Sequence, residues 1–365
     1  MSQPDATHAE ADDQSDPTPN DQQQQLIDSL DGTYLVDAGA GTGKTFTVTR
    51  RYANILETAD VTPEDILLIT FTRNAATEMR DRIVRQCDYG MAELADAPIQ
   101  TFHSLCSDLL DEYGFDVPQH LGLDDHLPSS MRIIEDEVVE EALFQEFFER
   151  FVDDHPEYSG LIRTIDSPSN LLGLIKQLAS KGVIPTAEGW YRDSDRHLTG
   201  DFEAFKQRFD EQNAPRNGGS KQSRLRSKLG RYGRDKCYLP DAPEKAELRG
   251  EGKAVPESVA ARVFEEDREE LTAFVHDLYV EYLRFALARN YLNFGFLQLF
   301  AFVLLCEDHQ LRERVGFEYA MVDEFQDSSE LQFKLTLLLA GTDNICVVGD
   351  WKQSIYSFQY AAVEN

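Results

Sequence analysis

The stretch Ala38-Gly39-Ala40-Gly41-Thr42-Gly43-Lys44-Thr45 decides the fold class of this chain. It follows a short apolar run, Tyr34–Asp37, and opens a segment that can be helical. Glycines let a backbone wrap around phosphates with its N–H groups pointing inward, and a helix N-terminus adds a positive dipole. Lys44 would then reach the β- and γ-phosphates of a nucleotide, and the Thr45 hydroxyl would bind Mg²⁺. The alternative is a glycine-rich turn that happens to end in Lys-Thr.

Such a loop needs acidic groups that hold the metal ion and orient water, and Val322–Asp327 supplies them after another apolar run. Asp323 would hold Mg²⁺, and Glu324 would polarise the attacking water. In a chain this acidic, a solvated acidic turn is the alternative. The position after an apolar run, together with the phosphate loop, favours the catalytic interpretation.

The apolar runs predict an α/β fold with a parallel sheet covered by helices on both faces, because each run is almost continuously apolar. The four predicted strands are Tyr34–Asp37, Ile66–Phe71, Tyr319–Asp323 and Ile345–Val348. About 250 residues separate the first two strands from the last two, which predicts a large insertion. Two sets of apolar residues at helical spacing make that insertion mainly helical: Ile133, Ile134, Val138, Ala142, Leu143 and Phe147, and then Leu271, Phe274, Leu278, Tyr282 and Phe285.

The predicted organisation has three parts within the 365 residues. Residues 1–21 form a disordered acidic tail, 22–110 and 291–365 form the sheet domain, and 111–290 form the helical insertion. Within the insertion, residues 212–236 carry eight basic side chains against one acid, a charge of +7. This basic loop also contains four glycines, which favours a mobile loop or a loose hairpin. It either contacts DNA or is a solvated loop.

The overall charge argues against a nucleic-acid partner. The chain has 35 Lys and Arg against 66 Asp and Glu, a net charge of −31, whereas phosphate binding normally requires a basic surface. The acidic N-terminus does not resemble a signal peptide, and the longest apolar stretch, Phe296 to Cys306, is too short to cross a membrane. The five cysteines show no CxxC spacing. A cytoplasmic protein with no membrane partner is expected, and the acidic composition is typical of adaptation to high salt.

The motifs nevertheless resemble those of the UvrD/Rep/PcrA group of superfamily 1 DNA helicases. Five segments occur in the order of that family: the phosphate loop, Ile69–Met79, Thr101–Ser104, Val322–Asp327 and Val348–Tyr356. Gly43–Thr47 and Lys352–Phe358 look more like the RecB/AddA branch, whose members are helicase-nucleases. The resemblance implies a RecA-like ATP-binding domain that uses ATP and Mg²⁺ and moves on single-stranded DNA.

The resemblance also implies roles for individual residues. Gln23 matches the glutamine that reads adenine, although its neighbours Gln22, Gln24 and Gln25 leave the register open and a polar linker is the alternative. Phe46 stands where UvrD-type proteins usually have an arginine that packs on adenine, so either Phe46 stacks on the base instead or the adenine contact is weaker. The implied nucleotide-binding residues are Gln23, Ala40, Gly41, Thr42, Gly43, Lys44, Thr45 and Phe46; the implied catalytic residues are Lys44, Asp323, Glu324 and Gln353.

Single-stranded DNA would run over aromatic faces that stack on bases and over hydroxyl and amide groups that bind the backbone. The matching residues are Phe71, Thr72, Asn74, Thr101, His103, Tyr356 and Phe358. Core packing is the alternative for Phe71 and Tyr356, and a structural hydrogen bond is the alternative for His103. The basic loop would approach duplex junctions.

Two departures limit what the resemblance implies. Gln359 stands where the family usually has arginine, and the chain stops at Asn365, before the family's second RecA-like domain and its arginine fingers. The expectation is that this chain binds ATP but hydrolyses it poorly alone. The alternative to a helicase motor is therefore an ATP- and DNA-binding fragment or subunit that needs a second polypeptide. In the family the movement is 3′→5′, in repair or recombination. An ATPase acting on something other than DNA remains a third reading.

Overall fold

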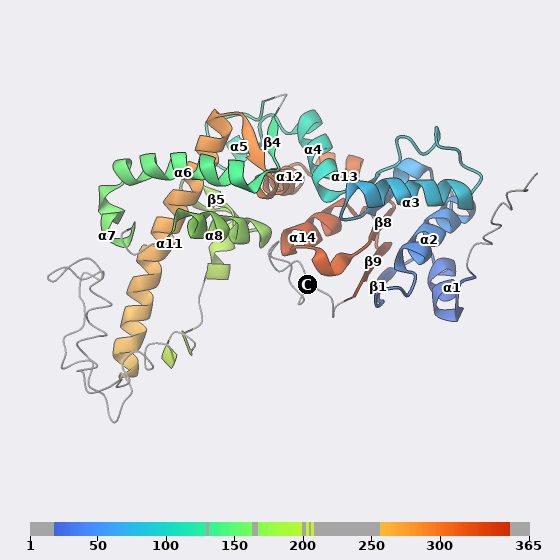
Figure 1. Ribbon diagram of the computed structural model, residues 1–365, viewed down its shortest axis with the longest axis horizontal. Coiled ribbons are helices and arrows are strands. Elements are labelled where there is room, and N and C mark those ends of the chain that lie inside the picture. Colours follow the sequence, from blue (N-terminus) through green and yellow to red (C-terminus); the bar gives the residue numbers. More distant parts are fainter. Residues whose placement is uncertain are drawn as a thin grey trace, which may run out of the picture.

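The computed structural model describes residues 18–128, 131–162, 167–198, 202–203, 206–207 and 256–350. A parallel sheet with the strand order β1-β9-β8-β2-β3 forms one end of an elongated molecule, and a helical part forms the other end (Figure 1). Its strands are β1 (Thr33–Asp37), β2 (Ile66–Ile69), β3 (Ile99–Gln100), β8 (Tyr319–Val322) and β9 (Ile345–Gly349). The predicted α/β fold class is confirmed, with its four strands shifted by at most two residues at their ends. The edge strand β3 was not predicted, because two residues carry no periodicity.

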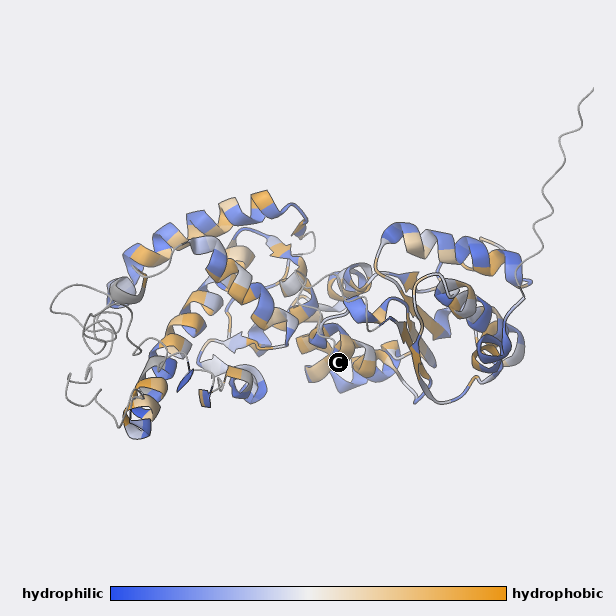
Figure 2. Ribbon diagram, turned by 60° about the horizontal axis from the view of Figure 1, so that its bottom comes forward, coloured by the Kyte–Doolittle hydropathy of each residue, from blue (hydrophilic) through white to orange (hydrophobic). Residues whose placement is uncertain are grey.

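The sheet separates two hydrophobic clusters, because successive side chains of a strand point to opposite faces. Ile66, Leu68 and Val348 face the first cluster, which α2 (Lys44–Thr58) and α3 (Arg73–Gln86) cover. Leu67 and Val347 face the second cluster, which α4 (Phe102–Tyr113), α12 (Phe294–Glu307) and α14 (Glu330–Leu339) cover. Figure 2 shows the strands as mostly hydrophobic, with hydrophilic residues along the outer sides of the flanking helices.

The second cluster continues without a break into the helical part, so the two ends of the molecule share one core. The helix α12, whose described residues include the apolar stretch from Phe296 to Cys306, is almost wholly buried in this core. In the part of the chain that the structure describes, no helix is long and apolar enough to cross a membrane. The remaining helices are α1 (Asp21–Asp28), α5 (Val117–His120), α6 (Glu137–Asp154), α7 (Ser159–Ile162), α8 (Pro168–Ser180), α11 (Glu257–Ala288) and α13 (His309–Val315).

Short elements complete the described part. The pair β4 (Arg132–Ile134) and β7 (Tyr291–Asn293) is parallel, and the pair β5 (Pro185–Thr186) and β6 (Gly189–Trp190) is antiparallel. The 3₁₀ segments are η1 (Pro63–Asp65), η2 (Pro156–Tyr158), η3 (Tyr191–Leu198) and η4 (Phe325–Asp327). The long helix α11 runs away from the sheet towards the far end of the molecule (Figure 1).

The apolar pattern from Ile133 to Phe147 is helical as predicted only from Val138 onward, and Phe147 is its buried member on α6. Ile133 and Ile134 lie in β4 and not in a helix, because Asp136 caps the N-terminus of α6 and starts the helix after them. Val138 is 75% exposed, and Ala142 is also exposed. The buried face of α6 instead comprises Glu140, Phe144, Phe147, Phe148 and Phe151. The second pattern, from Leu271 to Phe285, lies on α11 as predicted.

Several predictions fall on residues that the structure does not describe. These include residues 1–17 of the predicted tail and the basic loop 212–236. Gln353, Tyr356 and Phe358 also lie outside the described residues. The described helix α1 begins at Asp21, the last residue of the predicted tail, with Asn20 as its cap.

Candidate nucleotide and DNA site

The phosphate loop joins β1 to α2 at the carboxyl edge of the sheet. Gly43 caps α2 with φ at 86°, and Gly41 has φ at 73°, so both adopt left-handed conformations that favour glycine. The Thr42 hydroxyl donates to the Gly39 carbonyl oxygen at 2.7 Å and closes the turn. The first N–H groups of α2 lack partners within their own helix, as at any helix N-terminus, and they suit an anion.

The phosphate loop meets the predicted acids, although about 280 residues separate them in the sequence. Lys44 Nζ lies 2.6 Å from Glu324 Oε2, and the Lys44 side chain is only 9% exposed. The Thr45 hydroxyl lies 3.3 Å from Asp323 Oδ2. The sheet brings them together because parallel strands end at the same edge, and the predicted site residues follow β1 and β8 there.

Asp323 and Thr45 offer the oxygen donors that Mg²⁺ prefers. Burial, and then the nearby Glu324 carboxylate, raises the pKa of Asp323 to about 6. The raised pKa means that the neighbouring groups do not fully offset the negative charge of the buried carboxylate. A hard cation such as Mg²⁺, bound to the oxygens of Asp323 and Thr45, would offset it. The described residues contain no group of three or more His, Cys, Asp or Glu that could hold a metal ion by themselves. Mg²⁺ that also binds substrate phosphates usually takes only one or two carboxylates from the protein.

Glu324 stands in a strained turn directly after β8. Its φ of 53° is left-handed, which is uncommon for a residue with a side chain. Its backbone N–H donates to Asp323 Oδ1 at 3.0 Å. Strain of this kind is concentrated at functional sites, where the surrounding structure holds it in place.

Gln23 is the glutamine of its run that contacts the phosphate loop. Its Nε2 donates to the Thr42 carbonyl oxygen at 2.8 Å, and a Cβ on Gly43 would lie 3.0 Å from the same nitrogen. Gln24 instead donates to Asp28. The run is the helix α1 rather than a polar linker, and Gln23 forms its capping box with Asn20. The buried Arg51 of α2 holds the C-terminal end of α1 in place by donating to the carbonyl oxygens of Leu26, Ser29 and Leu30.

A cavity of about 370 Å³ lies over the phosphate loop. Its lining contains Ala40, Gly41, Gly43, Lys44, Thr45, Phe46, Arg82 and Glu324. The guanidinium of Arg50 lies 5.4 Å from the centre of the Phe46 ring. Sequence reasoning missed Arg82, which pairs with Glu78 one turn earlier on α3. That spacing signals an ion pair on a helix but not that the helix borders the phosphate loop.

The predicted DNA residues of the described part lie after β2 and β3, at the same edge. Thr72 and Thr101 cap α3 and α4, where their hydroxyls accept from the N–H groups of Ala75 and Ser104 at 3.1 and 3.2 Å. Asn74 is exposed and Phe71 is half-buried, whereas Thr101 is 6% exposed. Thr101 has a structural role as a helix cap, whereas Thr72 and Asn74 are exposed.

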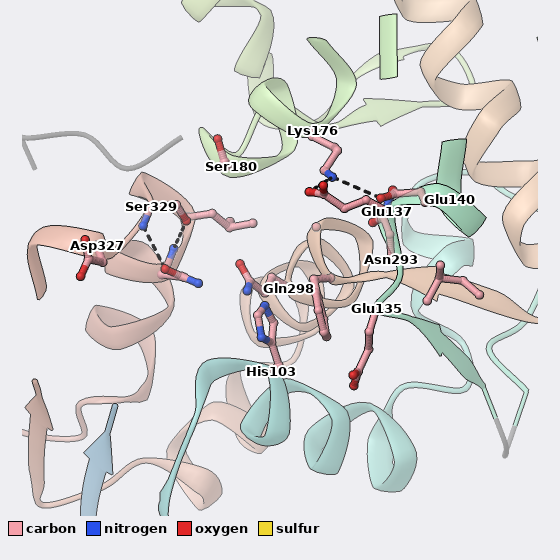
Figure 3. Close-up of a pocket in the computed structure, with 15 residues that line it drawn as sticks. His103, Glu135, Glu137, Glu140, Lys176, Ser180, Asn293, Gln298, Asp327 and Ser329 are labelled. Atoms are coloured by element: carbon pink, nitrogen blue, oxygen red, sulfur yellow. Dashed lines mark hydrogen bonds and ion pairs between the residues drawn. The ribbon is translucent and has the colours of Figure 1, made fainter. Parts of the chain in front are cut away.

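His103 lines a cavity of about 240 Å³ between the sheet and the helical part (Figure 3). Its ring stacks on Phe294, with 3.8 Å between the centroids and 21° between the planes. Burial, and then the charge of Arg73, lowers the pKa of His103 to about 4. The imidazole is thus neutral at pH 7 and presents a flat, uncharged surface.

On the opposite wall, the buried Glu140 accepts from Lys176 at 3.2 Å and from Asn293 at 2.6 Å (Figure 3). These bonds tie α6, α8 and the start of α12 together.

The comparisons with known proteins identify the family. The family model for the UvrD/REP helicase N-terminal domain matches residues 19–365. The chain belongs to this helicase family. A probable DNA helicase II homolog of Mycoplasma capricolum is 26% identical over 348 residues, which cover 94% of this chain and 36% of that protein.

Two further relatives carry more specific names. The ATP-dependent DNA helicase PcrA of Bacillus subtilis is 26% identical over 349 residues, 95% of this chain and 34% of that protein. The ATP-dependent DNA helicase Rep of Escherichia coli is 26% identical over 350 residues, 95% of this chain and 38% of that protein. The chain spans little more than a third of the length of these relatives.

Proposed function

We propose that this member of the UvrD/REP family is the ATP-binding motor part of a DNA helicase that couples ATP hydrolysis to movement on single-stranded DNA. The observation that carries this proposal is the meeting of Lys44 with Glu324 and of Thr45 with Asp323. The family's relatives support the DNA substrate, since PcrA and Rep are named ATP-dependent DNA helicases. The direction would be 3′→5′, and the pathway would be repair or recombination in the cytoplasm.

The proposed chemistry begins with a change of partner at Lys44. The γ-phosphate is the stronger anion, so Lys44 turns from Glu324 to the phosphate when ATP enters. Thr45 and Asp323 would hold Mg²⁺, which would supply positive charge that offsets the charge of the phosphates. Glu324, released from Lys44, accepts a proton from the attacking water while the bond between the γ-phosphorus and the bridging oxygen breaks. Gln23 reads the adenine edge, and Phe46 stacks near the base.

The proposed DNA path crosses the carboxyl edge of the sheet. Phe71, Thr72, Asn74, Thr101 and His103 lie along it, and Tyr356 and Phe358, which lie outside the described residues, would belong to it as well. Gln353, also outside the described residues, would sense the γ-phosphate and couple it to DNA. The basic loop 212–236 would contact duplex junctions. Charge reversal at Arg224, Arg226 and Lys228 tests that contact, and unchanged affinity for a junction would leave the loop as a solvated segment.

We propose further that these 365 residues bind ATP but hydrolyse it slowly by themselves. Phosphoryl transfer depends strongly on an arginine that stabilises the transition state. Among the described residues, Arg82 is the arginine in the phosphate-loop cavity, and Glu78 already binds it. A second RecA-like domain, from further chain or from a second polypeptide, would supply the positive charge of that arginine.

We also propose that the chain is more similar to the RecB/AddA branch than to UvrD itself. The proposed sheet domain comprises residues 22–110 and 291–365, and the proposed helical insertion comprises residues 111–290.

An ATPase assay with and without single-stranded DNA tests the proposal. Slow hydrolysis that rises when a second motor domain is added supports a motor part. ATP and DNA binding without turnover under all conditions favours a non-catalytic subunit. Turnover that does not respond to DNA, by a chain that does not bind DNA, would favour an ATPase with another substrate and would overturn the proposal.

A further inference from the structure

Gln326 lies between the nucleotide site and the end of β9, and only 5% of it is exposed. Its Nε2 donates to Glu324 Oε2 at 2.8 Å and to Asp327 Oδ2 at 3.1 Å. Its Oε1 accepts from the backbone N–H of Asp350 at 2.8 Å. An amide side chain has two N–H donors and one carbonyl acceptor, so each of its polar groups has a partner here.

The backbone of β9 is fitted closely to this amide. A Cβ on Gly349 would lie 2.7 Å from Gln326 Oε1 and 3.0 Å from the Gln326 backbone nitrogen. These distances are shorter than ordinary contacts, so only glycine permits β9 to approach Gln326 this closely. A movement of the Gln326 side chain must therefore displace the backbone at Gly349 and Asp350.

Glu324 Oε2 is held by two donors, Lys44 at 2.6 Å and Gln326 at 2.8 Å. When Lys44 turns towards a phosphate, Gln326 is the donor that stays. Gln326 also separates two carboxylates that would otherwise repel each other, because its Nε2 lies between Glu324 and Asp327. Its amide is neutral, so it can keep Glu324 oriented without removing the negative charge that polarises water.

We propose that Gln326 is a positioning residue with two tasks. It holds the Glu324 carboxylate when Lys44 turns to the nucleotide. Any movement of Glu324 then moves the Gln326 side chain, which moves the backbone at Asp350. The proposal rests on the proposed ATP chemistry of Lys44 and Glu324.

The test uses Trp351, which directly follows Asp350 in the sequence. The chain has two tryptophans, Trp190 and Trp351, so Trp190→Phe leaves a single fluorescent reporter. In that parent, the affinity for ATP–Mg²⁺ and the change in Trp351 emission on binding are measured together. Gln326→Met keeps the length of the side chain and removes all three hydrogen bonds. We expect it to reduce the emission change about tenfold, while ATP affinity changes by less than about threefold, since the phosphate loop is untouched.

Gln326→Glu separates the two tasks. It retains an oxygen that accepts from Asp350 but loses the donor to Glu324 and brings a third carboxylate to the cluster. We expect emission without ATP to match the parent and the response to ATP to be lost. The matched control is Gln332→Met, because Gln332 is a nearby glutamine whose Oε1 accepts from Ser329 instead. It should respond to ATP like the parent.

The possible outcomes separate the two proposals. A full emission change in folded Gln326→Met, or the same loss in Gln332→Met, would overturn the role of Gln326. A parent that binds ATP without any emission change would also overturn it, and the proposed ATP site would stand. A parent that does not bind ATP would overturn both. Thermal unfolding of each variant shows whether it is folded, and if Gln326→Met does not fold, Gln326→Glu decides.

Discussion

At the scale of single residues, we expect nucleotide binding to depend most on the side chain of Lys44. It is nearly buried and its ammonium group contacts Glu324 at 2.6 Å, so its removal also leaves that carboxylate without its cation. We expect Lys44→Ala to weaken ATP binding by at least about tenfold, since a charge-assisted bond contributes roughly 1.5–3 kcal/mol. Titration with a fluorescent ATP analogue measures this. Lys334→Ala, which removes a partly exposed lysine from an ion pair on α14, is the control.

His103 gives a prediction for pH. Its pKa is lowered to about 4 by burial, below the value of 6.5 for an exposed histidine. The unfolded chain therefore takes up this proton first, and acidification from pH 6.5 towards pH 4 destabilises the fold. His103→Gln should make the free energy of unfolding fall less steeply over this range, by up to about 1.4 kcal/mol per pH unit. Urea unfolding at several pH values measures the difference, and equal slopes in both proteins would show that His103 titrates normally.

Local chemistry explains which site residues the sequence could predict. The loop from Gly39 to Thr45 could be predicted because phosphate binding requires glycines, a lysine and a hydroxyl group at fixed spacing. Arg82 and Gln326 could not be predicted in the same way. Gly41 comes close to Arg82, and Asp350 comes close to Gln326, only through the fold.

At the scale of elements, the buried face of α6 gives a test of packing. Phe144 is 1% exposed and lies against Tyr282 of α11, whereas Val138 is 75% exposed on the same helix. Phe144→Ala should lower the free energy of unfolding by about 3–5 kcal/mol. Val138→Ala should change it by less than about 0.5 kcal/mol. Equal effects in urea unfolding would mean that the helix buries the face predicted from sequence.

The same helix shows why some elements were predictable and others were not. Strands such as β2 are buried on both faces, so their unbroken apolar runs identify them. The run around Ile133 fits helical spacing equally well, and only the Asp136 cap separates strand from helix. The pairing of β4 with β7 joins residues about 160 positions apart, which no local pattern records.

At the scale of the whole molecule, the net charge of −31 remains the feature least suited to a DNA partner. At about 1 M salt the Debye length falls to about 3 Å, so acidic surfaces repel DNA only near contact. Counterion release contributes less there, and stacking and local hydrogen bonds would carry DNA binding. We propose on this ground that the protein works in high salt.

The thermal stability of the protein should also depend on salt. Self-repulsion among the acids weakens the folded state at low ionic strength, and salt screens it. The midpoint of thermal unfolding should therefore rise steadily from about 0.05 M to about 1 M KCl. A midpoint that is the same or higher at low salt would contradict the proposed adaptation, while leaving the nucleotide site unaffected.

One edge of the sheet is proposed to bind both ATP and single-stranded DNA. Fluorescence anisotropy of a labelled single-stranded oligonucleotide, titrated with the chain with and without ATP–Mg²⁺, tests this proposal. We expect that the oligonucleotide binds, that ATP changes its affinity, and that Lys44→Ala binds the oligonucleotide but loses the response to ATP. An oligonucleotide that does not bind, or an affinity that ATP leaves unchanged in the wild-type chain, would show that the sheet edge does not couple the two ligands.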